Sequence, residues 1–202
     1  MGLWIHSTWT ILFPNMQIPL FPLNTVLFPG GPLPLRVFEP RYLDMISRCM
    51  KSDGPFGVLL IREGNEVGPA TTYNTGTLAK VVDWYQGSDG ILGITAMGTD
   101  RFRLLAVERQ DDGLNVGDVE LLPDAPESEI PDEYQSLPPI LESVMNDLGR
   151  LYENLERRSG DAAWVAYRFA EILPIDMEQK QAFLESNDVS AFLARIDEVL
   201  HK

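Results

Sequence analysis

The residue types that most often carry enzyme chemistry are scarce in this chain. Its 202 residues include two histidines, His6 and His201, one near each end, and a single cysteine, Cys49. A lone imidazole is a poor candidate for base catalysis, and zinc or iron–sulfur sites need several histidine or cysteine ligands. The sequence therefore predicts no metal and no cofactor, and Cys49, in a helical pattern, is expected to be a buried and unreactive thiol.

Motifs of nucleotide hydrolysis and nucleophilic catalysis are also missing. A phosphate-binding loop ends in Gly-Lys-Ser or Gly-Lys-Thr, and the chain has no such string. Gly87-Ser88-Asp89-Gly90 has the wrong spacing for a serine nucleophile elbow. The acidic pairs Asp111/Asp112 and Asp132/Glu133 fall in a turn and a linker, where carboxylates are normally solvated. We therefore expect no enzymatic activity, with an unrecognised hydrolase as the alternative, because catalytic sites are defined by geometry.

The net charge of −14 is concentrated in one half of the chain. Residues 1–107 hold 8 Lys and Arg against 8 Asp and Glu, whereas residues 108–202 hold 8 against 22. An acidic surface repels phosphate backbones, so nucleic acid is not an expected partner. No apolar run approaches the roughly 20 residues of a membrane-spanning helix. The single cysteine and the missing secretory signal favour a cytoplasmic protein without membrane contact.

From Gln17 to Leu122 the sequence has the pattern of short strands separated by turns. Asp89-Gly90 predicts a hairpin between strands at 77–85 and 91–97. A second hairpin is expected at Asp111-Asp112-Gly113, between strands at 102–109 and 114–121. The imperfect alternation within 102–109 is typical of a strand that is covered on both faces.

One helix interrupts these strands. Pro40 suits the first helical position, apolar residues then recur at three- and four-residue spacing, and the helix is expected to end near residues 52–54. Many short strands with one brief helix favour a closed or nearly closed β-barrel over a layered α/β sheet.

Beyond Pro123 a stretch rich in Pro, Glu, Asp and Ser predicts a linker, and the residues after it have helical periodicity. One long amphipathic helix is expected from Ile140 to Leu155. Three shorter helices are expected with Asp161, Asp176 and Asp188 as N-caps, covering 162–173, a segment through 184, and 189–200. The predicted fold is α+β, organised as an extension (1–15), a β-barrel (16–123), a linker (124–136) and a helical bundle (137–202).

Several separated segments resemble one known family, that of the amino-terminal domains of Lon proteases. Ile18–Tyr42 (IPLFPLNTVLFPGGPLPLRVFEPRY) is similar to the opening of these domains, Gly76–Ala79 to their Gly-Thr turn, and Gly98–Arg103 to their Gly-x-x-Arg-Phe element. Trp164–Glu185 looks like their helical end. The strand at 114–122 departs from the family pattern, because it lacks the usual aromatic residue and alanine.

The resemblance implies a pseudo-barrel related to PUA domains, followed by a helical bundle. It also implies a stand-alone, non-catalytic recognition unit that binds client proteins or peptides, with an ATP-dependent protease as a partner in trans. RNA binding is an alternative that rests on the PUA analogy alone. In the matched opening, Pro19, Pro22 and Pro29 predict strand edges or ends, and Gly30 and Gly31 predict a tight reversal.

Seven residues are candidates for peptide contact, in a groove that lies either beside the barrel or between the barrel and the bundle. Three are charges among apolar neighbours, for which internal ion pairing is the alternative; four are aromatic, for which a place in the core is the alternative. The candidates are Glu39, Arg41, Arg101, Tyr42, Trp84, Tyr85 and Phe102.

Overall fold

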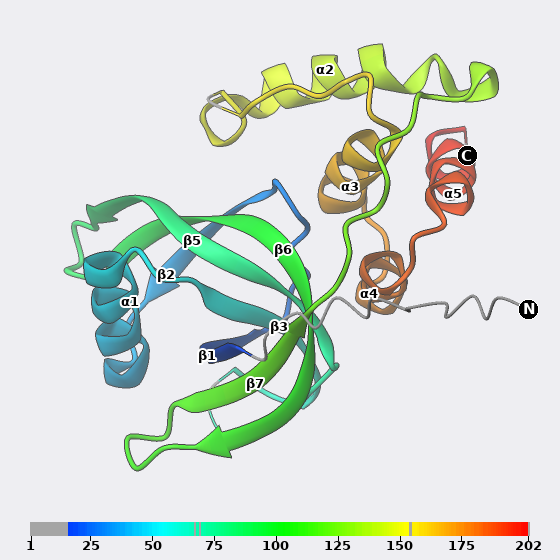
Figure 1. Cartoon of the computed structure of the whole chain (residues 1–202). Coiled ribbons are helices and arrows are strands. Elements are labelled where there is room, and N and C mark those ends of the chain that lie inside the picture. Colours follow the sequence, from blue (N-terminus) through cyan, green and yellow to red (C-terminus); the bar gives the residue numbers. More distant parts are fainter. Residues whose placement is uncertain (1–15, 67, 69, 154, 202) are drawn as a thin grey trace, which may run out of the picture.

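The computed structural model describes residues 16–66, 68, 70–153 and 155–201, so the predicted extension at 1–15 and His6 lie outside the described residues. The fold is α+β, as predicted (Figure 1). The strands are β1 (Met16–Leu23), β2 (Pro32–Val37), β3 (Phe56–Gly64), β4 (Ala70–Thr72), β5 (Thr75–Gln86), β6 (Leu92–Arg109) and β7 (Asn115–Leu121). The helices are α1 (Pro40–Ser52), α2 (Leu137–Leu148), α3 (Ala162–Ile172), α4 (Met177–Glu185) and α5 (Val189–Leu200).

The seven strands form one sheet that closes on itself. Its order is β1-β7-β6-β5-β3-β4, and β1 returns to pair in parallel with β3. Strand β2 stands off this path and pairs only with the first half of β6. The predicted barrel is therefore confirmed, with β2 as an additional strand that has one free edge among the residues that the structure describes.

Strand β1 is not an edge strand, although it contains Pro19 and Pro22. Its first half, Met16 to Leu20, pairs with β7, and its second half, Leu20 to Leu23, pairs with β3. Each half thus has a neighbour on one side only, which tolerates a proline that cannot donate a ladder hydrogen bond. The strand edges predicted from the prolines are therefore present within each half of β1, although the strand as a whole lies between β7 and β3.

Both predicted hairpins are present, and each turns at a glycine with positive φ, Gly90 at 79° and Gly113 at 83°. The strands predicted at 91–97 and 102–109 are one continuous strand, β6, which bends through a register shift and pairs with three neighbours. The prediction that 102–109 is covered on both faces was wrong, because residues 105–109 are exposed.

The helical predictions were right in number and wrong in one length. The helix expected from Ile140 to Leu155 ends at Leu148, because Gly149 adopts a φ of 65° and a short 3-10 turn follows. Asp161 and Asp188 cap α3 and α5 through their side chains, as expected. Asp176 stands at the N-cap position of α4, as expected, but its side chain forms no capping hydrogen bond.

Helices α2 to α5 gather on one side of the sheet, whereas α1 packs against it at the other end (Figure 1). One apolar core joins the helices to Val26, Phe28 and Leu60 of the sheet region. A second core lies under α1 and contains the buried Cys49, and a third fills the barrel between β1, β3 and β6. The segment predicted as a linker contributes to the first core, because Ile130 is buried there and Glu129 forms a β-bridge with Asp161.

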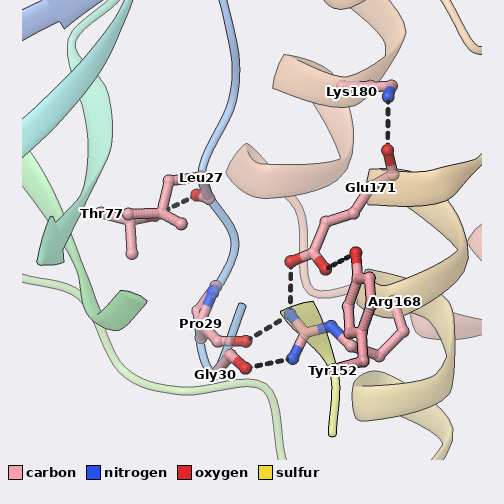
Figure 2. A network of polar contacts seen from close by, with 8 residues as sticks. All are labelled: Leu27, Pro29, Gly30, Thr77, Tyr152, Arg168, Glu171 and Lys180. Carbon is pink, nitrogen blue, oxygen red and sulfur yellow. Dashed lines mark hydrogen bonds and ion pairs between the residues drawn. The ribbon is translucent and has the colours of Figure 1, made fainter. Parts of the chain in front are cut away.

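Two buried arginines, Arg101 of β6 and Arg168 of α3, connect the helices to the rest of the chain. Arg168 of α3 has no exposed surface, and its guanidinium donates to the carbonyls of Pro29 and Gly30 and to the carboxylate of Glu171 (Figure 2). Gly30 has a φ of 67°, as its reversal requires. Gly31 is needed for space instead, since a Cβ there would collide with the Glu171 carboxylate.

Candidate functional site

An open groove of about 450 Å³ lies beside the barrel, between β1, β2 and the start of α1. Its lining is mainly apolar and includes three charged side chains. The lining residues are Phe21, Leu23, Thr25, Leu33, Pro34, Leu35, Arg36, Val37, Phe38, Glu39, Tyr42 and Glu66. We call this hollow the groove.

The free edge of β2 runs along the groove. Successive side chains of a strand point to opposite faces, so a cavity on one face would touch alternate residues only. The groove instead touches Leu33 to Val37 without interruption. Since β2 pairs with β6 on its other side, its unpaired edge faces the groove. Pro34 lacks an N–H group, which prevents it from donating at such an edge.

Tyr42 is one of the aromatic residues that line the groove. Its ring stacks on Phe21 of β1 with centroids 4.1 Å apart, and the Arg41 guanidinium lies 4.6 Å from the ring centre. Burial is the main reason that the pKa of the Tyr42 hydroxyl is raised, and the nearby Arg41 partly opposes this shift. The hydroxyl therefore stays neutral and can take part in hydrogen bonds.

Glu39 and Arg41 form an ion pair of 2.8 Å, which confirms the internal pairing considered for them. Arg41 also donates from Nη1 to the carbonyl of Gly113, at 2.9 Å. Of these two residues only Glu39 lines the groove, whereas Arg41 pairs with Glu39 and lies over the Tyr42 ring.

Trp84 and Tyr85 are 57% and 56% exposed, near the end of β5. Trp84 pairs across the sheet with Ile94, which pairs in turn with Leu35 of the groove. Cross-strand partners point to the same face, so Trp84 lies on the face of Leu35, two strands or about 10 Å away. Tyr85 points to the opposite face, where its ring covers Gly93.

Arg101 and Phe102 are not at the groove, and their candidacy for peptide contact is withdrawn. Phe102 is fully buried in the barrel core, and Arg101 is 2% exposed. The Arg101 guanidinium donates to the carbonyls of Pro123, Leu184 and Ser186 and to the side chain of Asn187. It connects the barrel to α4, and a peptide has no access to it.

Most of the residues that line the groove were not predicted from the sequence. Leu33, Leu35 and Val37 alternate along β2, a signal that could have placed them on one face, but nothing local shows which strand lies opposite. Phe38 is 60% exposed, and its aromatic side chain directly precedes Glu39. Of the seven candidates, Glu39 and Tyr42 line the groove and Arg41 and Trp84 lie near it, whereas Tyr85 points to the opposite face of the sheet.

The second predicted position, between the barrel and the helices, holds a smaller hollow of about 250 Å³. It is rich in carboxylates, and Arg158 already pairs there with Glu127 and Asp161. Since its one cation is already paired and its lining is less apolar, this hollow is a weaker binding candidate than the groove.

Among the described residues, neither the cysteine nor the histidine lines either hollow. Burial raises the pKa of the Cys49 thiol, which disfavours the thiolate, and Cys49 lines neither hollow. His201 is exposed beside Asp197 at the C-terminal end of α5. Across residues 16–66, 68, 70–153 and 155–201, no cluster of three or more His, Cys, Asp or Glu residues could hold a metal ion. In the same ranges no helix is both long and apolar enough to span a membrane.

Comparison with known proteins gives a consistent family. The model of the ATP-dependent protease La (LON) substrate-binding domain matches residues 17–202. Lon protease 2 of Myxococcus xanthus is 27% identical over 195 residues, which are 92% of this chain and 23% of that protein. The chain therefore spans about a quarter of the length of this relative.

Solved structures share the fold. The crystal structure of a Lon N-terminal domain protein from Xanthomonas campestris is 34% identical, with a TM-score of 0.73 over 90% of this chain and 96% of that one. The N-terminal domain of the Mycobacterium avium complex Lon protease superposes with a TM-score of 0.62 at 18% identity, covering 91% of this chain and 97% of its own. The second likeness bears on the fold alone.

Proposed function

The chain belongs to the family of the ATP-dependent protease La (LON) substrate-binding domain, and from this premise we propose that it binds exposed apolar segments of client proteins in the groove. The family supports a substrate-recognition module in the general sense. The finer statement, that clients enter this groove in an extended form and that binding serves proteolysis, is our proposal.

One observation carries the proposal: an apolar hollow of about 450 Å³ runs along the free edge of β2. Binding sites for other molecules are typically concave, mostly apolar and rimmed by a few polar groups. An extended peptide could place its side chains against Phe21, Leu33 and Leu35. Such segments are buried in folded proteins and exposed in unfolded ones, so the groove would select damaged or unfinished clients.

We further propose that an ATP-dependent protease acts on the clients that the groove binds. The acidic second half of the chain gives no reason to expect a nucleic acid instead. The family supports this partnership, because its model is that of the substrate-binding domain of an ATP-dependent protease.

A peptide titration tests the proposal. Fluorescence anisotropy with a labelled, unstructured peptide of alternating apolar residues should show saturable binding. Leu35→Glu places an unpaired charge on the groove wall and should weaken binding by roughly tenfold or more. The matched control is Leu148→Glu, because Leu148 is an exposed leucine on α2, away from the groove.

Thermal melts establish that both variants are folded before their affinities are compared. Equal loss of binding in the two variants, or no saturable binding by the unaltered protein, contradicts the proposal. Cleavage of casein by the same preparation without ATP would favour the hydrolase alternative.

A further inference from the structure

A small polar pocket of about 120 Å³ adjoins the groove. Its polar lining comes from Arg41, Tyr42, Asn65, Glu66, Arg109 and Asn115. Tyr42 and Glu66 line both hollows, so the groove and the polar pocket meet at these two residues. A peptide that leaves the groove past Tyr42 therefore reaches the polar pocket.

Two guanidinium groups converge in the polar pocket. A Cβ on Gly113 would lie 3.4 Å from Nη2 of Arg109 and 3.7 Å from Nη1 of Arg41, so both cations flank the same glycine. The β6–β7 hairpin produces this arrangement, since Arg109 pairs in register with Asn115 and Gly113 lies in the turn between them. The turn also accepts the hydrogen bond from Arg41 that fixes its side chain.

The two arginines differ in how far their charge is satisfied. Arg41 is held by Glu39 and Gly113, and only its Nε atom is buried without a partner. Among the described residues no side chain forms an ion pair or hydrogen bond with the Arg109 guanidinium. Glu66, the one acid in the lining, accepts a hydrogen bond from the main-chain N–H of Asn24 at 2.8 Å.

We propose that the polar pocket binds a carboxylate of the client, so that the protein prefers apolar segments that end in a free C-terminal carboxyl group; this inference rests on the proposed function of the groove. The planar fork of a guanidinium matches the two oxygens of a carboxylate. Asn65 and Asn115 add amide donors, and the neutral Tyr42 hydroxyl adds another.

Charge balance favours a singly charged group. The lining carries the guanidinium groups of Arg41 and Arg109 against the single carboxylate of Glu66, a net charge of +1, which matches one negative charge. A doubly charged phosphate would also face Glu66 within the pocket and Glu39 beyond Arg41, and the repulsion would oppose its entry. The carboxylate is therefore the ligand class that this set of side chains fits best.

Three labelled peptides of one apolar sequence test the inference. The first ends in a free carboxylate, the second in an amide, and the third has the amide end and an aspartate at the last position. The free acid should bind about tenfold more tightly than the amide. In Arg109→Gln this ratio should fall to about twofold or less, because only the free acid presents a negative charge to Arg109 and loses that interaction in the variant.

The matched control is Arg103→Gln, since Arg103 lies on the same strand, is exposed and pairs with Glu120 outside the polar pocket. It should leave the tenfold ratio intact. Tight binding of the aspartate peptide would also support the pocket and would show that side-chain carboxylates enter it.

Equal affinities of acid and amide, or a ratio that persists in Arg109→Gln, overturn the inference. If all three peptides bind equally and Leu35→Glu still abolishes binding, the carboxylate pocket fails and the groove stands. If no peptide binds, both proposals fail.

Discussion

Glu171 lies one helical turn after Arg168, and its carboxylate accepts a hydrogen bond of 2.6 Å from the Arg168 guanidinium (Figure 2). Both side chains lie in the interior, at 0% and 11% exposure. Tyr152 donates to the other carboxylate oxygen at 3.5 Å, and Lys180 donates to the main-chain carbonyl of Glu171. Since Arg168 also donates to Pro29 and Gly30, this network attaches α3 to the loop between β1 and β2.

We expect Arg168→Met to lower the free energy of unfolding by about 3 to 5 kcal/mol. The methionine fills much of the volume but leaves two buried carbonyls without donors and Glu171 without its cation. Urea denaturation followed by circular dichroism measures the effect. The control is Arg195→Met, which removes an exposed pair with Glu198 and should cost less than about 1 kcal/mol. Equal losses in the two variants would mean that the buried network adds nothing.

Glu171 should make stability depend on pH. Burial raises its pKa from 4.5 to about 7, against the opposing effect of Arg168. Between these two values the folded chain keeps a proton that the unfolded chain has released. The contribution of Glu171 to the free energy of unfolding is therefore fully present below about pH 4.5 and is lost as pH rises through 7.

Glu171→Gln removes this titration. Relative to the variant, the unaltered protein should lose up to about 3 kcal/mol between pH 5 and pH 8. Urea denaturation of both proteins across this range provides the comparison. Parallel stability curves, or a difference of opposite sign, would show that the carboxyl group is ionised throughout.

Gly98 should tolerate no side chain. A Cβ at this position would collide with the main-chain carbonyl of Phe28, which cannot move like a side chain. Gly98→Ala should therefore cost about 2 kcal/mol or more in unfolding free energy. Gly160→Ala is the control, because the space around Gly160 is open, and it should change stability by less than about 0.5 kcal/mol. Thermal and urea denaturation of both variants decide whether the close approach is real.

The sequence predicted the features that depend on neighbours along the chain. Asp161 and Asp188 were identified as helix caps because the capping bond spans two or three residues. Asp89-Gly90 identified its hairpin for the same reason. The family resemblance also pointed to Gly98 and Arg101, and the structure supplies their physical roles in close packing and in hydrogen bonding to α4.

The features that depend on distant neighbours were not predictable in this way. Arg168 stands in a run of apolar residues, and its acceptors Pro29 and Gly30 are about 140 residues earlier in the chain. The groove depends on how β2 lies against β1 and α1, which no local pattern specifies. Whether an aromatic side chain is exposed could not be predicted from the sequence either. Phe102 and Trp84 both lie in strands, yet of these two only Trp84 faces solvent.

Trp84 and Tyr85 offer a test of the groove's extent, because they are adjacent, similarly exposed and on opposite faces of the sheet. Trp84 shares a cross-strand row with Leu35, so a peptide longer than the groove should reach it. Trp84→Ala should weaken binding of a labelled apolar peptide several-fold while changing stability by less than about 1 kcal/mol, since the exposed indole contributes little to the core. Tyr85→Ala removes an aromatic ring from the other face and should leave affinity unchanged. Anisotropy titrations of both variants measure the difference, and equal effects would mean that the binding surface does not follow the face of Leu35.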